Sequence, residues 1–296
     1  MSDSFDALST FHLQRAGVRG TVVHLDETWR EIRSQASLPD PVAQRLGESL
    51  TASALFSGAL RFEGSLSIHL RNAGALRLMF AECTHDGRLR GIARMDEEAA
   101  HGAVDLRDAG ARLAITIENS RTETRYQGLV AVESDSLARA FEGYFERSEQ
   151  LPTHIMLAAG PAGCAGIMVQ KIADANEDSG SSDADAWNRV GHLLATLSER
   201  ELLELPVETL LLRLFHEEGV VLQPQRPLRF QCSCSRERVL GMIRALGRAE
   251  ATAALDAHGN ARITCEFCNR TYDVDRVDLA AVFASNPSAP GSMSTQ

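Results

Sequence analysis

Cys232-Ser-Cys234 and, thirty residues further along, Cys265-Glu-Phe-Cys268 contain four of the six cysteines of the chain. Two close cysteine pairs that a hairpin brings together form the tetrahedral thiolate site that zinc prefers. Each pair could also close into a disulfide, because its two members are only two or three residues apart. The two pairs therefore predict a small C-terminal domain that binds a metal, responds to oxidation, or does both.

The composition limits the classes of protein to consider. The chain has 296 residues, 44% of them apolar, and a formal net charge of −10. This length predicts two domains, or one large and one small. No secretory signal is evident in the first twenty residues, and the longest weakly polar stretch, residues 155–169, is too short and too rich in glycine to span a bilayer. We expect a soluble cytoplasmic protein without a membrane partner, and an acidic chain is also a poor ligand for nucleic acid.

Residues 1–175 are predicted to form an α+β domain with a mixed or antiparallel sheet and interspersed helices. Alternating apolar residues bounded by turn residues predict strands at 64–71, 75–83, 87–95, 112–118 and 124–132. Helical periodicity predicts helices at 41–60 and 134–147.

Residues 176–227 are predicted to be an acidic helical linker. It begins with a polar breaker at 176–185, and between Glu177 and Glu218 it has ten acidic and three basic residues, a net charge of −7. Its helices carry apolar stripes, and in one of them Leu210, Leu211, Leu214 and Phe215 lie on one face and must pack against something. The acidic residues either form ordinary solvated helix faces or make the linker marginally stable through self-repulsion.

Residues 228–285 are predicted to form the cysteine domain, followed by a disordered tail at 286–296. We expect a helix at 235–246, a hairpin turn at 258–260, a strand through Tyr272 and a last short helix. Asn269, which follows the last cysteine, fits the left-handed position of a zinc knuckle.

A domain this small gains little from hydrophobic burial, so bound zinc would supply part of its folding energy. The simplest interpretation is a structural zinc ribbon without chemistry. The Cys-x-Cys spacing of the first pair and the nearby Arg236, Arg238 and Arg270 favour reactive thiolates instead. Cys83 and Cys164, which have no cysteine close in sequence, are expected to be buried free thiols.

Several motifs resemble those of the redox-regulated heat-shock chaperone family, also called the 33 kDa chaperonin. The segment around the first cysteine pair, Phe230-Gln-Cys232-Ser-Cys234-Ser-Arg-Glu-Arg238, is similar to the family's, as are Cys265-Glu-Phe-Cys268 and Tyr272. Further segments that agree are Glu63-Gly-Ser-Leu-Ser67, Tyr144-Phe-Glu-Arg-Ser-Glu-Gln-Leu-Pro-Thr153 and Leu212-Arg-Leu-Phe-His-Glu-Glu218. The resemblance extends from about residue 10 to 283.

The resemblance implies an ATP-independent holdase chaperone rather than an enzyme. In its reduced form, Cys232, Cys234, Cys265 and Cys268 would bind one Zn(2+) per chain and keep the protein inactive. Oxidation would form the disulfides Cys232–Cys234 and Cys265–Cys268, release zinc and unfold the linker. The active form, typically a homodimer, would bind unfolding client proteins.

One hypothesis about the client site and two alternative functions complete the sequence-based expectations. The stripe of Leu210, Leu211, Leu214 and Phe215 is the expected client-binding region once the linker opens. Without the resemblance, the cysteine domain could instead be a nucleic-acid-binding zinc ribbon or a thiol–disulfide oxidoreductase. The balanced charge of residues 229–278, eight basic against seven acidic, opposes the first, and the lack of a thioredoxin-like context opposes the second.

Overall fold

The computed structural model describes residues 6–60, 62–96, 104–172, 185–256 and 258–284. Its chain divides into two compact units, Met1–Gln231 and Cys232–Gln296. Nearly all of the predicted polar breaker at 176–185 and the whole predicted tail at 286–296 lie outside the described residues. The three-part division into domain, linker and cysteine domain remains a prediction.

The first unit contains two six-stranded sheets. In the first sheet the strand order is β10-β1-β2-β9-β8, and β11 also pairs with β1. Its strands are β1 (Ala7–Leu13), β2 (Val18–Leu25), β8 (Thr153–Ala159), β9 (Cys164–Lys171), β10 (Val220–Leu222) and β11 (Arg226–Pro227). In the second sheet the order is β12-β5-β4-β3-β6-β7. Its strands are β3 (Gly64–Ala73), β4 (Leu76–Thr84), β5 (Arg88–Met95), β6 (Arg112–Asn119), β7 (Thr124–Val130) and β12 (Arg229–Phe230).

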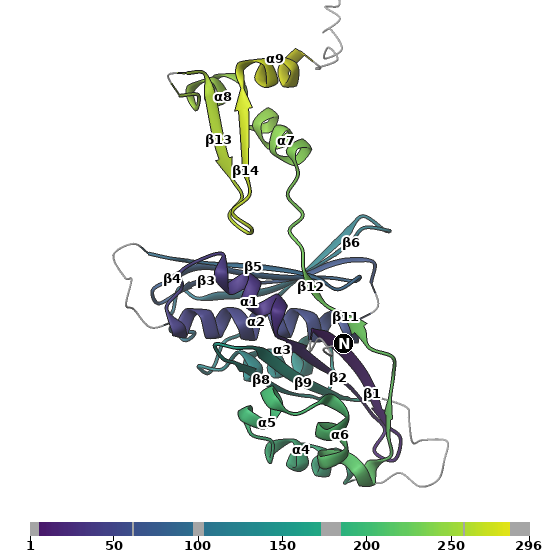
Figure 1. Ribbon diagram of the computed structural model, residues 1–296. Coiled ribbons are helices and arrows are strands. Elements are labelled where there is room, and N and C mark those ends of the chain that lie inside the picture. Colours follow the sequence, from purple (N-terminus) through teal and green to yellow (C-terminus); the bar gives the residue numbers. More distant parts are fainter. Residues whose placement is uncertain (1–5, 61, 97–103, 173–184, 257, 285–296) are drawn as a thin grey trace, which may run out of the picture. The chain divides into compact units, whose positions relative to one another are not determined.

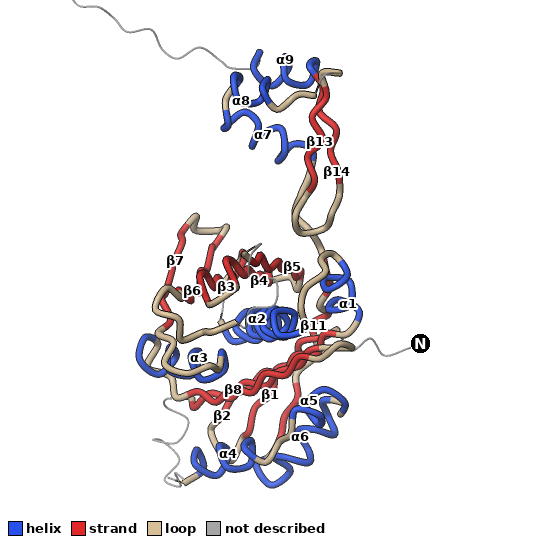
Figure 2. Tube along the Cα trace, turned by 90° about the vertical axis from the view of Figure 1, so that its left-hand side faces the viewer, coloured by secondary structure: helices blue, strands red, loops and turns tan. Residues whose placement is uncertain are grey.

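Helix α2 (Asp40–Ala59) lies between the two sheets and is buried over most of its length (Figures 1 and 2). Phe56 of α2 packs edge-on against Phe141 and Phe145 of α3 (Leu137–Ser148), with ring centroids 5.0 Å apart in both pairs. Helix α1 (Glu27–Ser34) adds the buried Trp29. The main hydrophobic core therefore surrounds α2 and contacts both sheets.

Three helices from the predicted linker cover the other face of the first sheet (Figure 1). They are α4 (Ala186–Ala195), α5 (Glu199–Glu204) and α6 (Val207–Phe215), and a 3-10 turn at His216–Glu218 follows. The side chain of Ser198 accepts a hydrogen bond from the backbone of Glu201, and Glu201 bonds back to the backbone of Ser198, so α5 begins with a capping box. Short strands β10 and β11 then return the chain to β1.

In its described residues, the second unit consists of a two-stranded hairpin and three short helices. Its elements are α7 (Arg236–Leu246), α8 (Arg248–Ala253), β13 (Asn260–Thr264), β14 (Thr271–Asp275) and α9 (Arg276–Ala284). The prediction that residues 258–260 form the turn of a hairpin is wrong, because this turn lies between α8 and β13 rather than between two strands. The hairpin instead closes at residues 265–270, where the second cysteine pair lies.

The predicted α+β class, the five strands and the two helices of the first 175 residues are confirmed, with ends shifted by a few residues. Within the described residues, no helix combines the length and hydropathy that crossing a bilayer requires.

Candidate metal centre

Two separate segments of the second unit supply four cysteine sulfurs to one cluster. Cys232 and Cys234 lie on the extended segment before α7, and Cys265 and Cys268 lie in the turn between β13 and β14. The four Sγ atoms all lie within 4.8 Å of one another. The Sγ–Sγ distance is 3.6 Å from Cys232 to Cys265 and 3.4 Å from Cys234 to Cys268. In the part of the chain that the structure describes, no other group of metal-ligating side chains was found.

Local hydrogen bonds fix the conformation of the two cysteine-bearing segments. The amide of Cys265 donates to the carbonyl of Arg270 at 2.9 Å, and the amide of Asn269 donates to the carbonyl of Cys265 at 2.8 Å. Asn269 has a φ of 54°, so the predicted left-handed position is confirmed. On the other segment, the side chain of Ser235 caps α7 by accepting from the amide of Arg238.

Tyr272 is a neighbour of the cluster that the spacing of the cysteines did not reveal. Its hydroxyl donates to Sγ of Cys234 at 3.1 Å. Burial works to raise the pKa of Cys234, but hydrogen bonds from Tyr272 and from the other thiols outweigh it and lower this pKa to about 7. Burial raises the pKa of Cys232 to about 12.

The arginines near the cysteines have different partners. Arg236 donates to the Asp278 carboxylate at 2.6 Å and to the carbonyl of Asp273 at 3.0 Å. Arg238 donates to the carbonyl of Ser233 at 3.0 Å. A hydrogen bond with Tyr272, then the charge of Tyr272 and then the charges of Cys234 and Cys268 raise the pKa of Arg270. Of the three, Arg270 is the one whose charge the structure links to the thiolates.

The donor set fits a soft, tetrahedral metal ion. A tetrahedron with metal–sulfur bonds of about 2.3 Å has sulfurs roughly 3.8 Å apart, close to the distances found here. The hydrophobic cluster of this unit is small, and its buried members include Val239, Ile243 and Val274, of which only Val274 is fully buried. Four cysteines on two segments could therefore hold a metal ion that also links those segments.

The two remaining cysteines are buried and unpaired, as predicted. Cys83 lies in the main core, where burial raises its pKa to about 11, and Cys164 lies there too. Neither belongs to the four-sulfur cluster.

The apolar stripe of α6 is covered in this structure. Leu210, Leu211, Leu214 and Phe215 are between 0% and 4% exposed. Phe215 stacks on Phe11 of β1, with ring centroids 6.2 Å apart. On α5, the carbonyl of Leu202 lies 2.7 Å from Nε2 of the buried His24. The expectation that this stripe packs against something is confirmed, and its role toward clients stays a prediction.

Comparisons with known proteins agree over almost the whole chain. A family model described as "Hsp33 protein" matches residues 6–275. The "33 kDa chaperonin" of Nitrosococcus oceani is 38% identical over 285 residues, which cover 96% of each chain. The protein of the same name from Ectopseudomonas mendocina is 40% identical over 282 residues, covering 94% of this chain and 95% of that one.

A solved structure has the same fold. The crystal structure of the 33 kDa chaperonin from Thermotoga maritima matches with a TM-score of 0.76. It covers 94% of this chain and 98% of that chain, at 20% identity.

Proposed function

Because the chain belongs to the Hsp33 family of chaperones, we propose that it is an ATP-independent holdase that oxidation switches on. Its partners are unfolding client proteins, and it acts in the cytoplasm, as a homodimer when oxidised. It is not an enzyme, and it binds neither nucleic acid nor membranes. The observation that carries the proposal is the convergence of four sulfurs within 4.8 Å.

In the reduced state, Cys232, Cys234, Cys265 and Cys268 hold one Zn(2+) as thiolates. Zinc keeps the sulfurs ionised and contributes folding energy to a unit with a small core. An oxidant such as hypochlorite or peroxide then meets nucleophilic thiolates. Forming two disulfides removes four electrons, which pass to the oxidant. The product has no anionic sulfur left to bind the metal, so zinc leaves.

The proposed disulfides lie within each pair, Cys232–Cys234 and Cys265–Cys268. The Sγ–Sγ distances of 3.6 and 3.4 Å run between the pairs, and all four sulfurs lie within 4.8 Å of one another, so proximity alone does not select this pairing. The family resemblance and the short chain between the partners favour it. Peptide mapping of the oxidised protein tests it, because disulfides from Cys232 to Cys265 and from Cys234 to Cys268 would overturn it.

The client surface is the stripe of α6 together with the face of the first sheet that it covers. Opening of the acidic segment would expose Leu210, Leu211, Leu214 and Phe215, which are buried at present. The double variant Leu211→Ser plus Leu214→Ser should lose suppression of aggregation after oxidation while still releasing zinc. Full activity in this variant, with normal solubility and zinc release, would rule out the stripe as the client site.

The central experiment measures zinc, free thiols and activity on one sample. Reduced protein is treated with hypochlorite, or with peroxide at raised temperature, and assayed with a thermally unfolding client. We expect one zinc and four thiols to be lost together, with activity appearing at that point and reversing after dithiothreitol and zinc. Zinc that stays bound, with no gain of activity, would contradict the proposed switch.

A further inference from the structure

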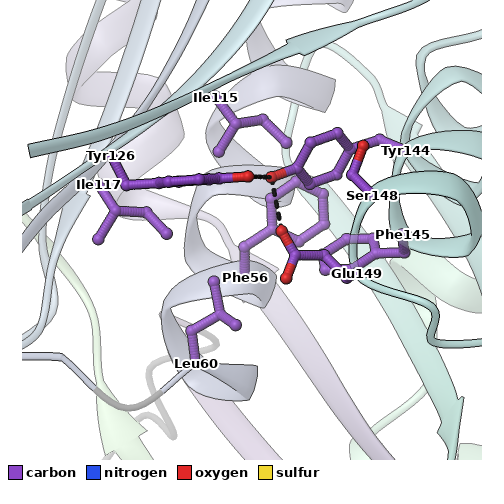
Figure 3. Close-up of a pocket in the computed structure, with 9 residues that line it drawn as sticks. All are labelled: Phe56, Leu60, Ile115, Ile117, Tyr126, Tyr144, Phe145, Ser148 and Glu149. Atoms are coloured by element: carbon purple, nitrogen blue, oxygen red, sulfur yellow. Dashed lines mark hydrogen bonds between the residues drawn. The ribbon is translucent and has the colours of Figure 1, made fainter.

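A pocket of about 230 Å³ lies in the first unit between its second sheet and the ends of α2 and α3. Figure 3 shows Ile115 and Ile117 on one side and Phe56, Leu60 and Phe145 on another, so most of the wall is apolar. Pockets for drug-sized ligands measure about 300–1,000 Å³. This one is the size of a single large side chain.

The lining also contains polar groups, which meet where the two tyrosine hydroxyls converge (Figure 3). The hydroxyl of Tyr144 donates to Oε1 of Glu149 at 2.8 Å and lies 3.4 Å from the hydroxyl of Tyr126 (Figure 3). Burial and these hydrogen bonds raise the pKa of Tyr144, so it stays a donor. Among the described residues, none donates to the second carboxylate oxygen of Glu149, and the residue as a whole is exposed. The pocket therefore offers one anionic acceptor beside two tyrosine hydroxyls.

The same pocket borders an open sheet edge. Strand β7 is the last strand of its sheet, and within the described ranges no strand pairs with its outer side. Its exposed side chains include Tyr126, 50% exposed and part of the pocket wall, and Leu129, 73% exposed. Unpaired amide and carbonyl groups along such an edge are complementary to another extended backbone.

We propose that β7 and this pocket together bind an extended polypeptide segment that adds to β7 as a strand and places an arginine side chain in the pocket. A residue opposite Tyr126 on an added strand would have its Cβ about 4.5–5.5 Å away, on the same face of the sheet. The apolar stem of an arginine matches the isoleucine and phenylalanine wall. Its guanidinium meets the free oxygen of Glu149 and the ring of Tyr126, a combination of ion pair and cation–π contact.

This site is separate from the proposed client surface. Every residue of its lining lies between Phe56 and Glu149, so none belongs to α4, α5 or α6 or to the cysteine unit. The α4, α5 and α6 helices that bury the α6 stripe therefore contribute no residue to this pocket. The segment therefore binds to reduced, zinc-loaded protein and to oxidised protein alike.

The test uses reduced full-length protein and labelled peptides of about nine residues, long enough to pair along β7. The peptides alternate threonine and valine around one central residue, which is arginine, citrulline or norleucine. Fluorescence anisotropy should show binding of the arginine peptide that is roughly tenfold tighter than that of the other two. N-methylation of the alternate peptide amides that face β7 should abolish binding. Hydrogen exchange of the protein amides at residues 124–130 should slow when the arginine peptide binds.

A matched pair of variants assigns the acceptor. Glu149→Gln keeps an oxygen for Tyr144 but removes the charge, and should lower affinity for the arginine peptide roughly tenfold. Glu146→Gln makes the same change at an exposed position of α3 outside the pocket, and should leave binding unchanged. Equal affinity for all three peptides, an unaffected Glu149→Gln variant, no binding, or binding only after oxidation would each overturn the proposal. None of these results bears on the zinc switch.

Discussion

Arg189 forms a bidentate salt bridge with the buried carboxylate of Glu218. Its Nε lies 2.6 Å from Oε1, and its Nη2 lies 3.0 Å from Oε2. The contact joins α4, the first described helix of the predicted acidic linker (residues 176–227), to the 3-10 turn at His216–Glu218 that follows α6. Glu218 is only 3% exposed, so loss of the arginine would leave a buried charge without this partner.

Arg189→Ala should therefore loosen the three helices on the first sheet. Breaking a buried pair costs about 3–5 kcal/mol, and we expect about 2 kcal/mol here because the Arg189 side chain is 37% exposed. Hydrogen exchange at residues 186–215 would report the change. The control is Arg200→Ala, whose pair with Glu204 is 82% and 59% exposed and should contribute less than about 0.5 kcal/mol. Equal exchange in the two variants would show that the Arg189 pair does not hold these helices.

Substitution of single cysteines separates the cluster from the buried thiols. Cys268→Ser should reduce the zinc content of the reduced protein from one per chain to well below that, because three thiolates leave the tetrahedron incomplete. Cys83→Ser, in the main core, should keep one zinc per chain. Elemental analysis after gel filtration measures both. Zinc retained by the first variant, or lost by the second, would contradict the proposed ligand set.

Tyr272→Phe tests the hydroxyl that donates to Cys234. Partners of metal ligands typically contribute 10- to 100-fold in metal affinity, so zinc should pass to a chelator roughly tenfold more readily than in the unmodified protein. Tyr126→Phe removes a hydroxyl from the other unit and should have no effect. An unchanged transfer rate and zinc affinity for Tyr272→Phe would mean that this hydrogen bond does not support the metal.

His24 should make the stability of the first unit depend on pH. Burial lowers its pKa below the usual 6.5, partly offset by the bond with Leu202 and the charge of Glu208. The unfolded chain therefore binds a proton that the folded chain does not, and stability falls as pH drops through about 6.5 toward the folded pKa. Urea unfolding at about pH 7.5 and about pH 5.5 should show that the unmodified protein loses more stability at the lower pH than His24→Gln does. Glu48, whose pKa burial raises, acts in both proteins and cancels in the difference.

A chain that ends at Gln231 should suppress aggregation without any oxidant, if the cysteine unit keeps the acidic segment closed. This end point keeps β12, which pairs with β5, and Leu228, which is 4% exposed. A chain that ends at Pro227 loses both and should be less stable by about 2–5 kcal/mol. A folded but inactive chain ending at Gln231 would contradict control by the cysteine unit.

Local patterns in the sequence predicted the elements that have local signals. Strands β3 to β7 alternate apolar residues between turn residues, which is the pattern that predicted them. The short strands β10 to β12 have only two or three residues each, too few for any periodicity to emerge. The turn at 258–260 was misassigned because a glycine marks a turn without saying which elements it joins.

The spacing of the cysteines predicts the metal-binding cluster, but it does not predict which side chains surround that cluster. Four cysteines in two pairs predict a cluster, whereas the contact of Tyr272 with Cys234 depends on how the hairpin lies against the segment before α7. The pocket depends on Gly128, because a Cβ there would lie 2.6 Å from the ring of Tyr144. Such an approach between distant segments leaves no periodic signal in the sequence.

The presence of β9 and β10 in one sheet has a consequence for the opened state. Lys171 ends β9 and Val220 begins β10, and both strands belong to the sheet that contains β1. If the helices between them unfold while the sheet persists, the freed chain is a closed loop with two anchored ends rather than a dangling tail. Closure limits the conformational entropy that opening releases, and it keeps both ends in place for refolding. A client held by such a loop would be tethered to the sheet from two sides.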